Sequence, residues 1–154
     1  MHKDYFYLFR CCCELKEEIL NYSFIEAFTQ EKDVLIFRIS SDGINSKYCM
    51  ISTNFQFPYI LMKEEFHRAK KNTISFFQSF FPSILLNIQI GNYERAIKFV
   101  FSDFEIIFLL RGHDTNILLI KNQHIVDSFK KIIDKPKIEK MLGDISFIEL
   151  EKQN

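Results

Sequence analysis

Residues that commonly join domains are scarce in this sequence. Its 154 residues include only four glycines and three prolines, and no stretch is rich in either. A chain of this length can form one domain that buries most of its unfolded surface, but it is too short for two domains of ordinary size. We therefore expect a single domain with one hydrophobic core.

A surplus of charge of one sign is also absent. Twenty basic and twenty acidic residues cancel, so the chain lacks the overall positive field of a dedicated nucleic-acid binder, and any such role must rest on local patches. Charged residues interrupt every apolar run before the roughly 20 residues that a membrane helix needs, and no secretory leader opens the chain. We expect a cytoplasmic protein that makes no membrane contact.

Metal-binding spacings and the common catalytic motifs are missing as well. Cys11, Cys12 and Cys13 are consecutive and Cys49 stands alone, which is neither a disulfide framework nor a ligand spacing. The four histidines are scattered, and no glycine-rich phosphate loop or nucleophile elbow occurs. The sequence therefore predicts no cofactor, no metal ion and no enzymatic activity.

Phenylalanine, by contrast, is abundant. Many of the 18 phenylalanines stand in strand-like company such as DVLIFRI and FEIIFLL, which favours a mostly-β or α+β domain. The first segment has another period, because apolar residues follow the potential cap Asp4 at positions 5, 8, 9, 12, 15 and 19. That spacing is one helix face, so we expect an N-terminal helix followed by strands.

Two series of short strands are predicted after this helix. The first covers residues 24–30, 34–40, 47–53 and 58–62, and the second covers 84–91, 95–102, 105–111, 116–120 and 123–126. Between the series, Asn72 or Thr73 as a cap and Pro82 as a stop predict a second helix over about residues 73–81. Residues 132–154 are rich in lysine and predict a short helix plus a tail, or the cut end of a longer architecture.

The first candidate for binding is a basic cluster just before the second predicted helix. Arg68, Lys70 and Lys71 stand where the free amides and the positive end of a helix would favour a phosphate. The alternative is an ordinary solvated loop. A second lysine-rich stretch, KKIIDKPKIEK, is more typical of a solubilising tail.

The second candidate is the charged pair Glu94-Arg95 in GNYERAIKFVF. In a strand from residue 95, Arg95 would share a face with Ile97, Phe99 and Phe101, because side chains alternate. Its stem could lie along these neighbours while the guanidinium stays in water or pairs with an acid. Alternatively, the guanidinium projects to contact a phosphate or to stack on an unpaired base.

Four segments in order resemble the N-terminal domain of the NFACT family over residues 5–131. They are YFYLFRCCCELKEEI, RAKKNTISFFQ, GNYERAIKFVF and FLLRGHDTNILLIKNQHIVDSFKK. That family includes bacterial proteins labelled fibronectin- or fibrinogen-binding, and ribosome quality-control factors that add tails to stalled nascent chains. The resemblance implies a β-sandwich similar to the N-terminal domain of formamidopyrimidine-DNA glycosylases.

The resemblance also implies partners and a site. In the tail-adding members this domain helps to hold a tRNA on the large ribosomal subunit, with a contribution from an Asp-Arg pair that is Glu94-Arg95 here. The helix-hairpin-helix, coiled coil and RNA-binding domain of full-length members do not follow in this sequence, which is expected either of a truncated family member or of a split one whose separate chain carries these domains. The glycosylases use an N-terminal proline, whereas this chain begins Met-His-Lys, and base excision is not expected.

These observations together predict an α+β fold, a mostly antiparallel β-sandwich with two helices. Residues 1–131 would form the NFACT-like domain and residues 132–154 the short helix or tail. We expect a non-catalytic module that binds tRNA or ribosomal RNA in ribosome-associated quality control. The alternative is a protein-binding module of the fibronectin- or fibrinogen-binding kind. The predicted RNA-binding residues are Glu94, Arg95, Arg68, Lys70 and Lys71.

Overall fold

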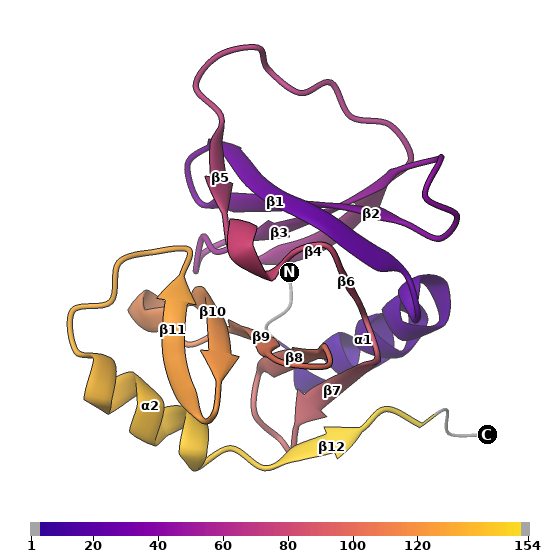
Figure 1. Cartoon of the computed structure of the whole chain (residues 1–154). Coiled ribbons are helices and arrows are strands. Elements are labelled where there is room, and N and C mark those ends of the chain that lie inside the picture. The colour runs from indigo at the N-terminus through magenta and orange to yellow at the C-terminus, as the bar shows by residue number, and fades with distance from the viewer. Residues whose placement is uncertain (1–3, 152–154) are drawn as a thin grey trace.

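Two antiparallel sheets packed face to face form the body of the protein (Figure 1). The computed structural model describes residues 4–151, and the remaining residues of the predicted tail and of the N-terminus lie outside this range. Within this range the chain forms two α-helices and twelve strands. The predicted α+β, antiparallel sandwich is therefore confirmed, although eight or nine strands were expected.

Each sheet is built from one half of the chain. The first has the order β4-β3-β2-β1-β5, with β6 also paired to β1, and the second has the order β11-β10-β9-β8-β7-β12. The strands of the first sheet are β1 (Ser23–Glu31), β2 (Val34–Ser40), β3 (Lys47–Ser52), β4 (Tyr59–Lys63), β5 (Ile74–Phe76) and β6 (Ser83–Ile84). Those of the second are β7 (Asn87–Gly91), β8 (Ala96–Val100), β9 (Glu105–Leu109), β10 (Asn116–Lys121), β11 (His124–Ser128) and β12 (Phe147–Glu149).

The main core lies between the sheets and is closed on one side by α1 (Tyr5–Ile19). Asp4 caps this helix by accepting a hydrogen bond from the amide of Phe6 at 2.9 Å. The predicted helix is confirmed, and the face that carries its apolar stripe is buried in the core. Its fully covered side chains are Leu8, Cys12, Leu15 and Ile19.

Both sheets are covered on their outer faces too. Helix α2 (Lys135–Gly143) packs Ile138 onto the second sheet, and β12 beyond it pairs with β7. The β4–β5 loop lays Phe66 on a smaller cluster around Phe28 on the first sheet. Strands such as β2 are consequently buried on both faces, which is why VLIFRIS is an almost continuous apolar run.

The predicted second helix over residues 73–81 is wrong. Residues 74–76 form strand β5, which pairs with β1, and a short 3-10 helix follows at Gln78–Phe80. Phe77 between them has a left-handed backbone (φ 56°) and a buried ring. Pairing with an existing strand and burial of this ring therefore outweigh the local helical pattern, which a sequence window cannot register.

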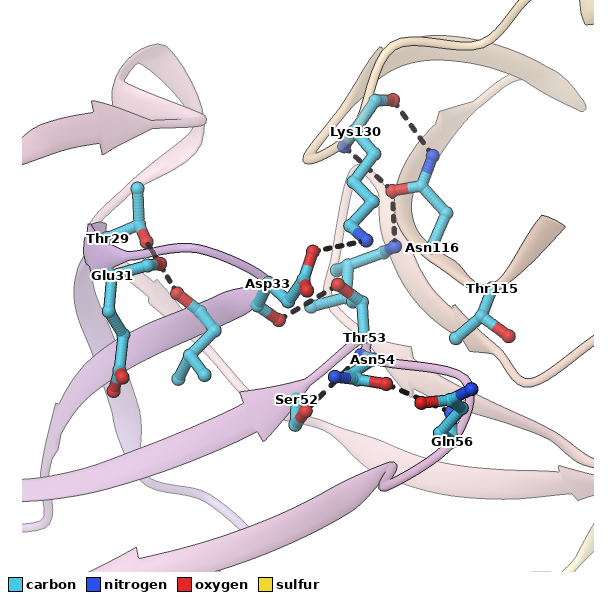
Figure 2. A network of polar contacts seen from close by, with 12 residues as sticks. Thr29, Glu31, Asp33, Ser52, Thr53, Asn54, Gln56, Thr115, Asn116 and Lys130 are labelled. Atoms are coloured by element: carbon cyan, nitrogen blue, oxygen red, sulfur yellow. Dashed lines mark hydrogen bonds and ion pairs between the residues drawn. The ribbon is translucent and has the colours of Figure 1, made fainter. Parts of the chain in front are cut away.

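A polar network joins the two sheets on the side of the sandwich away from α1 (Figures 1 and 2). The carbonyl oxygen of Asp33 accepts hydrogen bonds from the amide and hydroxyl of Thr53 at 2.7 and 2.8 Å, while its carboxylate pairs with the Lys130 ammonium. The buried Asn116 side chain bonds the amide and carbonyl of Lys130 at 2.8 and 2.9 Å. Its amide is thus satisfied, as burial requires.

The close contact around Gly91 generates a testable prediction. A Cβ atom at this position would lie 2.8 Å from the carbonyl oxygen of Glu94 and 3.1 Å from Cγ2 of Ile145. We expect Gly91→Ala to lower the free energy of unfolding by about 1–3 kcal/mol, the usual cost of overpacking, in urea titrations. Gly143→Ala is the control, because nothing lies within 4 Å of its Cβ position. An equal effect of both substitutions would contradict the assigned packing.

Candidate functional site

The turn that joins β7 to β8 lies against the first turn of α1. The Tyr5 hydroxyl donates a hydrogen bond to the carbonyl oxygen of Gly91 at 2.6 Å, which ties the helix to the turn. Tyr93 adopts a left-handed backbone (φ 57°), and its ring stacks on Tyr5 with centroids 5.4 Å apart. Phe6 meets the same ring edge-on at 6.3 Å. Three aromatic rings from two separate segments thus form one patch.

Two of these rings remain largely in solvent. Phe6 is 64% exposed and Tyr93 is 74% exposed, although both belong to a packed aromatic cluster. Tyrosine offers an apolar ring and a polar hydroxyl at a low entropy cost, which makes it common at binding surfaces. The patch therefore marks the first candidate contact surface.

Beside the patch, α1, the β7–β8 turn and β12 enclose a groove of about 690 Å³, which we call the aromatic groove. Its size is within the range of ligand-binding clefts. The residues that line it are Tyr5, Phe6, Phe9, Arg10, Cys13, Glu14, Asn92, Tyr93, Ile148, Glu149 and Glu151.

The aromatic groove carries net negative charge. Arg10 is the one cation among its described lining residues, against Glu14, Glu149 and Glu151. Amide donors on Asn87 and Gln89 bind the Glu149 carboxylate at 2.8 and 2.6 Å and hold its pKa below the ordinary value, so it is an anion at neutral pH. Such a groove attracts apolar and cationic side chains and repels phosphates.

Glu94 and Arg95 lie in the turn that precedes β8 rather than in the strand. Ile97 and Phe99 face the inter-sheet core as expected, but the strand begins at Ala96 and Arg95 is only half-buried. The Arg95 carbonyl accepts a hydrogen bond from the Leu110 amide at 2.9 Å. The arginine therefore does not occupy the apolar strand face on which it was predicted.

Glu94 is exposed and faces a second cavity, of about 360 Å³, between the turn and α2. Arg111, Lys137 and Lys140 line this cavity together with Glu94 and Asp144. Three cations against two acids leave a small positive surplus, opposite to the charge of the aromatic groove. The turn thus separates an acidic groove from a weakly basic cavity.

The basic cluster of Arg68, Lys70 and Lys71 lies on the β4–β5 loop, whereas the prediction placed it before a helix. Since residues 74–76 form a strand and not the start of an α-helix, Lys70 and Lys71 do not precede a helix N-terminus, and both side chains are exposed on the loop. The Arg68 guanidinium lies 4.1 Å from the centre of the Phe28 ring and pairs with Glu26. Arg68 therefore fastens the loop to the first sheet.

The structure does not bring the two predicted groups of residues together. The β4–β5 loop arches over the first sheet at the top of Figure 1, whereas the β7–β8 turn lies below, near β12. Whether Arg68, Lys70, Lys71, Glu94 and Arg95 bind RNA stays a prediction, but they cannot form one compact site.

Sequence reasoning missed the aromatic groove, although a signal for it exists. Phe6 and Tyr7 fall outside the apolar stripe of the N-terminal helix, so the spacing predicts that these two aromatic side chains point away from the core. The neighbouring ring of Tyr93 could not be assigned to them, because the contact joins residues far apart in the chain.

Within residues 4–151, no group of three or more histidine, cysteine, aspartate or glutamate side chains could hold a metal ion. Cys12 and Cys49 are buried, and burial raises the pKa of the Cys49 thiol to about 12, which leaves it protonated and unreactive. None of the described helices is long and apolar enough to cross a membrane.

Comparison with known proteins identifies the fold. No family profile and no curated protein matches the chain. The N-terminal domain of fibronectin-binding protein PavA from Streptococcus pneumoniae has a similar structure, with a TM-score of 0.71, 18% identity, and coverage of 82% of this chain and 53% of that chain. The N-terminal part of the fibronectin/fibrinogen-binding protein from Streptococcus suis gives a TM-score of 0.71, 16% identity, and coverage of 86% and 55%.

The chain spans about half the length of these two solved structures. The predicted resemblance to fibronectin- and fibrinogen-binding proteins is confirmed at the level of the fold. The assignment to the NFACT family stays a prediction.

The Glu26 contacts make the stability of this fold dependent on pH. Burial alone would raise the pKa of Glu26, but hydrogen bonds and attraction from Arg38 and Arg68 outweigh it and hold the pKa below the ordinary value. The contribution to stability is therefore present above the ordinary glutamate pKa of about 4.3 and is lost as pH falls through the lowered value. We expect Glu26→Gln to reduce stability at neutral pH and to flatten the decline in acid.

The measurement is urea unfolding of both proteins at neutral and acidic pH. Glu65→Gln, which removes an exposed carboxylate from the β4–β5 loop, is the matched control and should behave as wild type. If Glu26→Gln declines as steeply in acid as wild type, the assigned ion pairs do not contribute to stability.

Proposed function

We propose that this domain is a non-catalytic module that binds a partner protein through the aromatic groove. The observation that carries the proposal is an apolar cleft of about 690 Å³ with an acidic rim and two exposed rings at its mouth. The names of both similar structures, which describe fibronectin- or fibrinogen-binding proteins, support the same class of function.

The groove defines the chemistry of the partner segment. An aromatic or aliphatic side chain would stack beside Tyr93 and displace water from Phe6 and Phe9. A neighbouring lysine or arginine would meet Glu14 at the rim, since Glu149 is already paired with Lys16. The binding energy is thus expected to come from the buried rings, and the acids should set the orientation.

Fibronectin is the partner to test first. We expect purified domain to bind immobilised fibronectin, and Tyr93→Ala to weaken binding by at least about tenfold, or 1.4 kcal/mol, as for a central interface aromatic. Because Tyr93 is 74% exposed, its removal should hardly change the melting temperature.

Ile133→Ala is the control for this experiment, because Ile133 is 99% exposed and lies outside the groove. Equal binding by Tyr93→Ala and wild type would exclude the aromatic groove as the contact surface. If fibronectin does not bind at all, the proposal for this partner fails.

A second candidate function is RNA binding, favoured by the position of the Glu94-Arg95 turn. The turn lies between the exposed Tyr93 ring and the cavity lined by Arg111, Lys137 and Lys140. Rings that stack on bases, next to cations that contact phosphates, are typical of single-stranded RNA recognition. The NFACT resemblance would make the ligand a tRNA on the large ribosomal subunit, in the cytoplasm.

A tRNA titration at two salt concentrations tests this second function. Binding should be weak, because few phosphates are neutralised, and it should fall with salt, because each neutralised phosphate releases condensed counterions. We expect Arg95→Ala to cost about 1–3 kcal/mol, and Arg95→Lys to rescue only part, if the guanidinium makes a bidentate or stacked contact. Unchanged affinity in a folded Arg95→Ala would remove this residue from the site.

The paired substitution Lys70→Ala with Lys71→Ala shows whether the distant β4–β5 loop takes part. Melting curves of every variant are needed beside the titration, because Arg95 is half-buried. A collapsed melt of Arg95→Ala would assign a structural role to the arginine.

A further inference from the structure

Helix α1 borders a second groove on the side opposite the aromatic groove. This smaller groove, of about 230 Å³, lies between α1 and strand β4. Ile60, Leu61 and Met62 form its strand wall, and Glu14 and Glu18 bring the only charges among its lining residues. We call it the β4 groove.

Strand β4 is an open edge of the first sheet. It pairs with β3 alone, and within residues 4–151 no strand lies on its other side. In an antiparallel pair, every second residue directs its amide and carbonyl away from the partner strand. β4 therefore presents unpaired backbone donors and acceptors along one side.

The other sheet edges carry features that discourage pairing, and β4 does not. β5 and β12 are only three residues long, and the pairing of β11 with β10 contains a register shift. β4 runs for five residues in unbroken register, and its single charged residue, Lys63, lies at the end. Short strands, bulges and mid-strand charges are the usual protections, so β4 is an edge suited to accept another strand.

We infer that β4 is a docking edge for an extended segment of a partner protein, one that alternates apolar and basic side chains. The backbone of this segment would continue the first sheet beyond β4. Its apolar side chains would cover Leu61, which is 46% exposed and lies beside Met50 on the outer face of the first sheet. Its basic side chains, which alternate with the apolar ones, would enter the β4 groove on the other face and meet Glu14 and Glu18. This surface lies on the other side of α1 from the one in the proposed function and shares only Glu14 with it.

Charge favours such a partner over a second copy of the chain. Glu18 lies 3.9 Å from Lys47, which is also 3.5 Å from Glu64, so Glu18 stands at the Lys63 end of β4. Two copies paired antiparallel about Leu61 would set each Lys63 opposite the other Tyr59, at the far end. No cation of the second copy's strand would then reach Glu18.

A dye-labelled synthetic peptide of ten alternating valine and lysine residues is the probe, followed by fluorescence anisotropy. We expect it to bind at least about tenfold more tightly than a valine-glutamate peptide of equal length. Leu61→Lys should weaken binding about tenfold by placing a charge in mid-edge. Glu18→Gln should weaken it about twofold to fivefold, as for one exposed ion pair.

Tyr93→Ala distinguishes this inference from the proposed function and should leave peptide binding unchanged. Hydrogen exchange should slow at β4 amides when the peptide is added, and a peptide N-methylated at the alternate residues whose amides point toward β4 should not bind. Leu61→Lys must melt as wild type, which is expected because the side chain is half-exposed.

Four results would overturn the inference. The first is absence of binding at millimolar peptide, and the second is equal binding of the N-methylated peptide. The third is loss of binding in Tyr93→Ala but not in Leu61→Lys, because this result would place the peptide in the aromatic groove. The fourth is protection of β4 amides without peptide in a concentration-dependent dimer, which would make a second copy the occupant.

Discussion

Burial of phenylalanine between the two sheets is the constraint on which the rest of the structure depends. Phe24 of β1 meets Phe37 of β2 at 5.4 Å, and across the sandwich it meets Phe101 at 5.2 Å. These rings, in tilted and edge-to-face contact, fill the space between the two sheets and so set the distance between them. Such ring pairs contribute to stability beyond their buried area. Every covering element, including α1, then has to fit the space that these rings leave.

Helix α1 closes the open side of this core, and the two grooves follow from how it does so. The helix lies between an edge of each sheet, β4 on one side and β12 on the other. Because a helix is round and the sheet edges are flat, a groove remains between the helix and each edge. Glu14 lines both the aromatic groove and the β4 groove, so one residue of α1 contributes to the acidic character of both surfaces.

The elements predicted well are those whose signal is local and periodic. The apolar stripe of α1 predicts which face of the helix is buried, and the apolar runs of β2, β9 and β10 predict buried strands. The start of β8 was placed within one residue, at Arg95 instead of Ala96. The segment from Thr73 to Phe81 was misassigned, because its strand exists only through β1 and the buried Phe77 ring.

The sequence by itself determined a chain of no net charge and an α+β fold, because composition and hydrophobic period depend only on neighbours along the chain. It also determined that Phe6 lies outside the helix stripe. Only the tertiary structure decided that the Tyr93 ring meets Phe6 edge-on, that Arg68 pairs with Glu26, and that β4 remains an open edge. Such contacts join residues far apart in sequence, and their energies depend on distances that only packing of the whole domain sets.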